Sequence, residues 1–382
     1  MRDLLLSRQV WGPTVQKEST DISRWFENCC RVCLGNLNMP MRILFVLSLT
    51  CGLVSFAASQ NNPQTTAEPK MRQVEVTFRS GNVTLAGTLL LPESSVPVPA
   101  IVLDHGSGPM TREQGKPFGE RFVRDGLAAL IFDKRGCGAS GGSWTSASLD
   151  DLAEDAIAAA AFLKSRRDID GNRIGIWGVS QAGWVIPHAI ARSPGTFAFS
   201  VIVTGGAVKP LDNEKYDYNE ALEKIQATAE EKRDGMALVT RYFEYLRTGE
   251  GRAELESATA AAAGKRWGTA VDFSHVMPTP ETRQKWEWVP TYDPLDDIAH
   301  LNIPVLVVLG GRDRPGLVEL AEERWLSALH KNQNSDATVV VFTSAGHGIT
   351  TGTHHPDVKQ NRYAPGYLEL VDSWLRVHCA AQ

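Results

Sequence analysis

A serine stands in a turn between a buried strand and a helix. The segment IGIWGVSQAGW, residues 174–184, begins as an apolar run, reaches Ser180 and continues with an apolar helical pattern. Gly178 and Ala182, two positions before and after the serine, are small enough to let the strand and the helix approach each other. A hydroxyl held above a strand end is suited to nucleophilic catalysis, although glycine–serine turns also occur for structural reasons.

A serine hydroxyl needs an adjacent base, and the base needs a carboxylate that orients it. Asp313 follows the apolar run PVLVVLG, and His347 follows the run TVVVFT. Each residue also has a purely structural interpretation. Asp313 would cap a helix that begins near Pro315, and His347 would be an ordinary polar loop residue.

The turn GVSQAG resembles the nucleophile elbow, GxSxG, of the α/β-hydrolase superfamily, with Ala182 in place of the second glycine. The resemblance covers about residues 74–377 and is strongest to bacterial esterase-type serine hydrolases, which are related to dienelactone hydrolases and prolyl-oligopeptidase-like catalytic domains. In this superfamily the catalytic residues follow the chain order serine, acid, histidine. The resemblance therefore implies a triad of Ser180, Asp313 and His347.

The same resemblance implies where the negative charge of a tetrahedral intermediate is bound. Its oxyanion hole is made of backbone amides, one after the nucleophile and one in the loop after the third strand, here Gln181 and Ser107 in the segment LDHGSGPMTRE. His105 resembles a structural histidine beside that loop. In the segment FDKRGCGASGG, Asp133 and Arg135 are predicted to hold a glycine-shaped turn.

The strands that position these residues are recognisable from their hydrophobic patterns. RQVEVTF and VTLAGTLLLP alternate apolar and polar residues around a turn, which predicts a hairpin, whereas six later runs are apolar throughout. Helical patterns at 118–126 and 149–165 separate some of these runs. The sequence thus predicts an α/β fold, specifically an α/β-hydrolase fold with a mostly parallel eight-stranded sheet flanked by helices.

A long segment without strand patterns interrupts the predicted core, which comprises residues 73–207 and 291–379. Residues 208–290 have charged helical patterns and predict a helical lid inserted between the sixth and seventh strands. The lid contains aromatic residues that would either line an acyl pocket or pack the lid against the core. We predict substrate binding for three of them, Trp267, Trp286 and Trp288, and note Tyr242 and Phe243 beside them.

The N-terminal region has the pattern of an export signal. Residues 39–59 contain a short basic start, an apolar run and small residues, which predicts a secretory signal peptide, with an uncleaved membrane anchor as the alternative. Residues 1–38 are predicted to be an upstream extension, because signal peptides begin a chain, and 60–72 are predicted to form a polar linker. We therefore expect a periplasmic or secreted protein with no stable membrane span in its mature form.

Composition narrows the possible partners. The net charge of −5 over 382 residues and the lack of a basic stripe argue against nucleic acid. Cys29, Cys30 and Cys33 lack the further ligands of a metal site, so we expect neither metal nor other cofactor. Pairing between Cys137 and Cys379 is left open, as is the oligomeric state.

The predicted function is hydrolysis of a small-molecule carboxylic ester of small or medium acyl chain. Three alternatives use the same fold and the same triad, namely a serine peptidase, a thioesterase and a lactone hydrolase. A non-catalytic ligand-binding protein with a hydrolase fold is the alternative from another class.

Overall fold

A computed structural model describes residues 70–273, 277–352 and 360–379 of the protein. These residues belong to a unit that spans Glu68–Gln382. The predicted upstream extension, the signal peptide and all but the last residues of the linker lie outside the described residues. So do Cys29, Cys30 and Cys33.

Within the described residues, eight strands form one sheet in the order β1-β2-β4-β3-β5-β6-β7-β8. Strand β2 pairs antiparallel with β1 and β4, and the remaining pairs are parallel. This confirms the predicted sheet. The strands are β1 Met71–Ser80, β2 Val83–Pro92, β3 Val98–Asp104, β4 Ala128–Phe132, β5 Ile169–Val179, β6 Phe199–Val203, β7 Val305–Gly310 and β8 Ala337–Phe342.

Two boundaries differ from the sequence prediction. Strand β1 begins inside the predicted linker, because Met71 pairs with Pro92 at the open end of the hairpin. Helix α1 spans Arg112–Arg124 and so begins before the predicted residue 118. The reason is the cap at Thr111, whose backbone amide donates to the Gln114 side chain at 2.9 Å.

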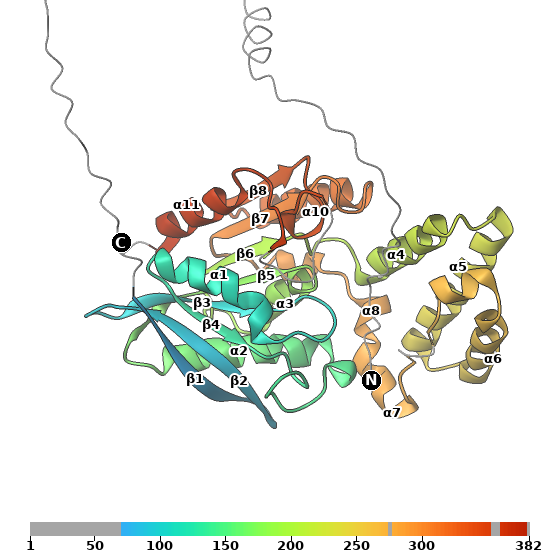
Figure 1. The fold of residues 1–382 in the computed structure, drawn as a ribbon, viewed down its shortest axis with the longest axis horizontal. Helices are drawn as coiled ribbons and strands as arrows, with labels where there is room; N and C mark the ends of the chain where they lie inside the picture. The colour runs from blue at the N-terminus through green and yellow to red at the C-terminus, as the bar shows by residue number, and fades with distance from the viewer. Residues whose placement is uncertain (1–69, 274–276, 353–359, 380–382) are drawn as a thin grey trace, which may run out of the picture. The chain divides into compact units, whose positions relative to one another are not determined.

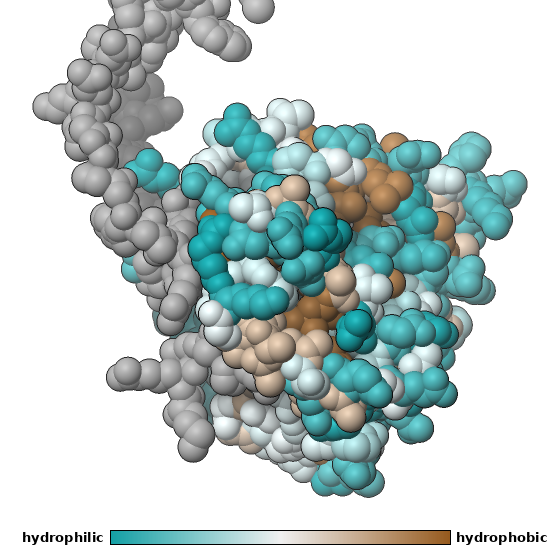
Figure 2. All heavy atoms as spheres, turned by 90° about the vertical axis from the view of Figure 1, so that its right-hand side faces the viewer, coloured by the Kyte–Doolittle hydropathy of each residue, from teal (hydrophilic) through white to brown (hydrophobic). Residues whose placement is uncertain are grey.

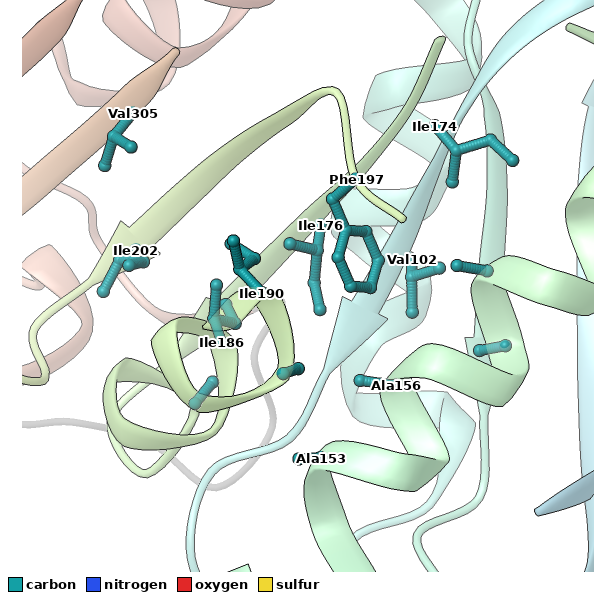
Figure 3. Close-up of a cluster of buried hydrophobic side chains, with 14 of the residues drawn as sticks. Val102, Ala153, Ala156, Ile174, Ile176, Ile186, Ile190, Phe197, Ile202 and Val305 are labelled. Atoms are coloured by element: carbon teal, nitrogen blue, oxygen red, sulfur yellow. The ribbon is translucent and has the colours of Figure 1, made fainter. Parts of the chain in front are cut away.

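Helices cover both faces of the sheet. Buried residues of α2 (Leu149–Lys164), α3 (Ala182–Arg192) and α10 (Leu317–Lys331) pack in one apolar cluster, and those of α1 and α11 (Tyr367–Cys379) pack in another. Figure 3 shows part of the first cluster, in which Ile186 of α3 and Ala156 of α2 lie near the strand residue Ile176. Burial on both faces explains why β6 and β7 are mostly apolar without alternation, as every residue of both strands is buried.

A helical insertion, defined here as residues 208–290, lies between β6 and β7 and extends beside the sheet (Figure 1). Its own apolar cluster includes Leu238, Tyr242, Phe243 and Phe273. From the side of the insertion, the surface is largely hydrophilic with separate hydrophobic areas (Figure 2). The α-helices between β6 and β7 are α4 Pro210–Lys224, α5 Ala229–Thr248, α6 Arg252–Ala263, α7 Pro280–Arg283, α8 Trp288–Thr291 and α9 Leu295–Ile298.

The structure bears on two further points from the sequence. No helix among the described residues is both long and apolar enough to cross a membrane. Cys137 and Cys379 are both buried and both free, so they do not form a disulfide with each other.

Candidate active site

Ser180 sits in a strained turn between β5 and α3. Its φ angle is +62°, in the left-handed region that side chains other than glycine seldom adopt. The turn is fixed by two backbone hydrogen bonds, from the Ser180 amide to the Val203 carbonyl at 2.9 Å and from the Gly183 amide to the Ser180 carbonyl at 2.8 Å. A strained residue held on both sides is the geometry of a nucleophile elbow.

Close backbone approaches explain the small residues around the serine. A Cβ atom added to Gly178 would lie 2.3 Å from the Cβ of Ala182, and one added to Gly205 would lie 2.1 Å from the Ser180 carbonyl oxygen. Real Cβ atoms do not approach other atoms this closely, so both positions require glycine. Alanine is tolerated at 182 because its Cβ faces Gly178, which has no side chain.

Asp313 and His347 meet at the ends of β7 and β8. The Nδ1 atom of His347 lies 2.8 Å from Oδ2 of Asp313. The carboxylate can therefore orient the imidazole and leave Nε2 available to accept a proton. Burial would raise the pKa of Asp313, but the hydrogen bond with His347 and the charge of Arg314 outweigh it and lower that pKa. The capping interpretation of Asp313 is wrong, because α10 begins at Leu317 after Gly316.

Ser180 and His347 lie at the same edge of the sheet, because β5 to β8 run parallel. Thr204, directly after the strand that binds the Ser180 amide, accepts a hydrogen bond from the Gly348 amide at 3.1 Å. The serine turn and the histidine loop are therefore attached to the same strand end. Among the described residues, no hydrogen bond joins the Ser180 hydroxyl to His347; such bonds commonly form only in the substrate complex.

The loop after β3 lies against the serine. A Cβ atom added to Gly106 would be 3.7 Å from the Cβ of Ser180, which places the next amide, that of Ser107, beside the nucleophile. In the part of the chain that the structure describes, neither the Ser107 amide nor the Gln181 amide donates to a protein acceptor. Both N–H groups are thus available for the predicted oxyanion hole.

The residues predicted to be structural have buried partners. His105 Nε2 lies 2.7 Å from the Phe132 carbonyl oxygen. Asp133 accepts from the Ala139 amide at 2.8 Å and pairs with Arg112, so it holds the glycine turn as predicted. Arg135 ties the same turn to α2, because its guanidinium pairs with Asp155 on that helix.

The three tryptophans of the insertion occupy different environments. Trp267 is 6% exposed and packs in the apolar cluster of the insertion itself. Trp286 donates from its indole to the Thr145 carbonyl at 2.7 Å, and the ring of Trp288 lies 6.1 Å from that of Trp184 on α3. These contacts pack the insertion and attach it to the core, while a role in binding an acyl chain stays a prediction.

Sequence reasoning missed several residues beside the triad. Arg314 donates to Asp313 at 3.0 Å and forms a two-pronged ion pair with Asp217 of α4, at 2.7 and 2.8 Å. Lys134, two residues after β4, donates from Nζ to the Gly106 carbonyl of the loop after β3 at 2.7 Å. Adjacency to Asp313 could have drawn attention to Arg314, but Asp217 lies in the insertion, whose sequence matches no motif that we recognise.

Groups suited to binding a metal are absent from the described residues: no set of three or more histidine, cysteine, aspartate or glutamate side chains is arranged to hold an ion.

Comparison with known proteins identifies the family. The model of the alpha/beta hydrolase family matches residues 101–358, and the chain belongs to this family. It is 39% identical over 132 residues to the quorum-quenching protein AidA of Acinetobacter baumannii, a match that covers 34% of this chain and 42% of AidA. It is 24% identical over 275 residues to the esterase EstD of Thermotoga maritima, covering 70% of this chain and 58% of EstD.

A solved structure agrees with the fold. The alpha/beta hydrolase GrgF from a Penicillium species superimposes with a TM-score of 0.51 at 17% identity, covering 82% of this chain and 100% of GrgF. The matched segments span less than two thirds of AidA and of EstD. The family match confirms the resemblance read from the elbow and the strand pattern.

Proposed function

We propose that the protein is a serine hydrolase of the carboxylesterase type, which cleaves carboxylic esters of small or medium acyl chain. The observation that carries the proposal is the Asp313–His347 hydrogen bond at the sheet edge where strained Ser180 lies. An esterase among the relatives agrees with it.

In the proposed reaction, the Ser180 hydroxyl attacks the ester carbonyl carbon while His347 accepts its proton. The Ser107 and Gln181 amides bind the oxyanion, and His347 returns the proton to the leaving alkoxide as the ester bond breaks. Water then attacks the acyl-enzyme through the same base and releases the acid. Asp313 keeps the imidazole oriented and stabilises its charged form in both halves.

The test is hydrolysis of p-nitrophenyl esters from acetate to palmitate by the wild-type protein and by Ser180→Ala. We expect turnover on the shorter esters and a loss of at least about 10⁴-fold in kcat in the variant. Ser165→Ala, which changes an exposed serine at the end of α2, is the matched control and should retain full activity.

Other outcomes separate the alternatives. Activity only on thioesters, lactones or peptides would keep the triad and replace the substrate class. Ligand binding without turnover in the wild-type protein would favour a non-catalytic binding protein. Turnover that survives in Ser180→Ala would contradict the proposed nucleophile.

We also propose export, from the pattern of residues 39–59. The mass of the mature protein recovered from its native cell envelope or medium should correspond to a chain that begins between residues 57 and 61. A mature chain that retains residues 39–59 would favour the membrane anchor instead.

A further inference from the structure

Lys134 is a buried cation behind the loops that form the proposed oxyanion hole. It lies two residues after the end of β4 and is only 3% exposed. Its Nζ atom donates to the Gly106 carbonyl oxygen at 2.7 Å and to Oε1 of the Gln181 side chain at 2.7 Å. One ammonium group thus joins the loop after β3 to the residue after the nucleophile.

Both acceptors are attached to the amides that the oxyanion needs. The Gly106 carbonyl and the Ser107 N–H belong to one conjugated peptide unit, so a cation on the oxygen polarises the N–H at the other end. The Gln181 side chain belongs to the residue that supplies the second N–H. A lysine in this place therefore strengthens one donor and fixes its distance from the other.

Stability of the fold does not account for this choice of residue. Burying an ammonium group is costly unless oppositely charged partners compensate. Here the hydrogen-bonded partners are neutral carbonyl groups, and the nearby carboxylates of Asp104 and Asp155 offset only part of the cost of burial. An apolar side chain of similar length would avoid that cost. The buried ammonium is explained if its positive charge stabilises the oxyanion that develops during the reaction.

We propose that Lys134 is a positioning residue of the oxyanion hole, which orients and polarises the peptide unit before Ser107 and ties it to Gln181. This inference rests on the proposed function, because it requires an oxyanion at that site. Lys134 itself acts through the two backbone amides and does not touch the substrate.

The surroundings predict how the lysine titrates. Burial lowers the pKa of Lys134 to about 8, while Asp104, Cys137 and Asp155 favour the charged form. Asp104 and His105 at the end of β3, and Asp155 on α2, line the small cavity beside Nζ. The ammonium is present below pH 8 and is lost as the pH rises through 8, so kcat/KM should decrease there.

The first experiment compares Lys134→Met with Arg121→Met. This control removes a partly buried cation elsewhere in the core, the partner of Asp372 between α1 and α11. For Lys134→Met we expect kcat/KM on the best ester to fall by about 10²-fold, mostly in kcat. Affinity for a boronic acid or trifluoromethyl ketone analogue should fall in parallel. Arg121→Met should lower the melting temperature without this loss of analogue affinity.

The second experiment leaves Lys134 in place and changes its partner Gln181. Gln181→Glu places a carboxylate on the ammonium and should move the alkaline decrease in kcat/KM to higher pH. Gln181→Ala removes an acceptor and should move it to lower pH. Opposite shifts follow from titration of Lys134 and not from general loosening of the turn, and this test remains available if Lys134→Met does not fold.

The outcomes distinguish the two proposals. If the wild-type protein shows serine-dependent turnover but the alkaline decrease is the same in both Gln181 variants, the role of Lys134 is overturned and the proposed function stands. If Lys134→Met and Arg121→Met lose substrate and analogue affinity equally, the role of Lys134 is also overturned. Failure of the wild-type protein to react with any ester or with a fluorophosphonate probe rejects both.

Discussion

The sheet core and the helical insertion hold their parts of the site by different means. In the core, backbone segments approach so closely that the glycines at 178 and 205 cannot carry a side chain. The insertion has an apolar cluster of its own and reaches the core through separate contacts, among them the ion pair of Lys285 with Asp151 at 2.7 Å and the ring contact of Trp288 with Trp184. The proposed chemistry thus depends on rigid packing, whereas the region that we propose for substrate selection is attached by interactions that change at lower cost.

Arg314 is the contact that joins the two regions at the triad. It donates to Asp313 in the core and to Asp217 in the insertion, and its φ angle of +53° shows that the backbone is held in an unusual conformation to do so. A shift of α4 would therefore move the guanidinium that stabilises the Asp313 carboxylate of the proposed triad. The comparison predicts large effects from changes in the core, intermediate ones at this contact and small ones inside the insertion.

The largest effect is expected from Gly205→Ala in the core. The new methyl group would lie 2.1 Å from the Ser180 carbonyl oxygen, so the elbow must shift. We expect a loss of at least about 100-fold in kcat/KM from misplacement of the nucleophile and a loss of about 1–3 kcal/mol in the free energy of unfolding. Ester kinetics and thermal unfolding measure the two.

Gly264→Ala is the matched control, because a Cβ atom there meets nothing within 4 Å and the residue ends a helix of the insertion. It should leave kcat/KM and stability nearly unchanged. Equal activity losses in both variants would contradict the contrast between a rigid core and a tolerant insertion.

The contact between the regions should give an intermediate effect. Asp217→Asn removes the charge that holds Arg314 and frees the guanidinium to move away from Asp313. We expect kcat/KM to fall about tenfold, roughly 1.4 kcal/mol, with the melting temperature little changed. The measurement is steady-state kinetics across the ester series.

Arg247→Met provides the comparison, because its partner Glu244 lies on the same helix and both side chains are largely exposed. Such a pair contributes little, so its loss should not affect activity. If Asp217→Asn is as active as Arg247→Met, the insertion does not act on the triad through Arg314.

The two regions also differ in how far they could be predicted. The elbow, the apolar strands and the Asp313–His347 pair follow from local patterns and from chain order, because parallel strands bring their carboxyl ends to one edge. The contacts of Lys134 and Asp217 could not be predicted in this way. They join segments far apart in sequence through side chains whose partners are fixed only by the packing of the whole domain.

The smallest effect should come from Glu214 within the insertion, and it should depend on pH. Burial and the nearby Asp217 raise the pKa of Glu214 to about 7, although Arg314 opposes them. A raised pKa means that the folded state favours the neutral acid. The stability associated with this group is therefore full below its unfolded pKa of about 4.5 and is lost as the pH rises through 7.

Glu214→Gln keeps the neutral shape and removes the titration. Relative to the wild-type protein, the variant should gain about 2–4 °C in melting temperature at pH 8 and nothing at pH 4. Glu256→Gln, on the exposed pair with Arg252 in α6, should show no such gain. A gain that is equal at both pH values would place the effect in general packing and not in the ionisation of Glu214. A gain confined to pH 8, with kcat/KM changed by less than about twofold, would show that the insertion tolerates a charge change that the glycine turns of the core could not accommodate.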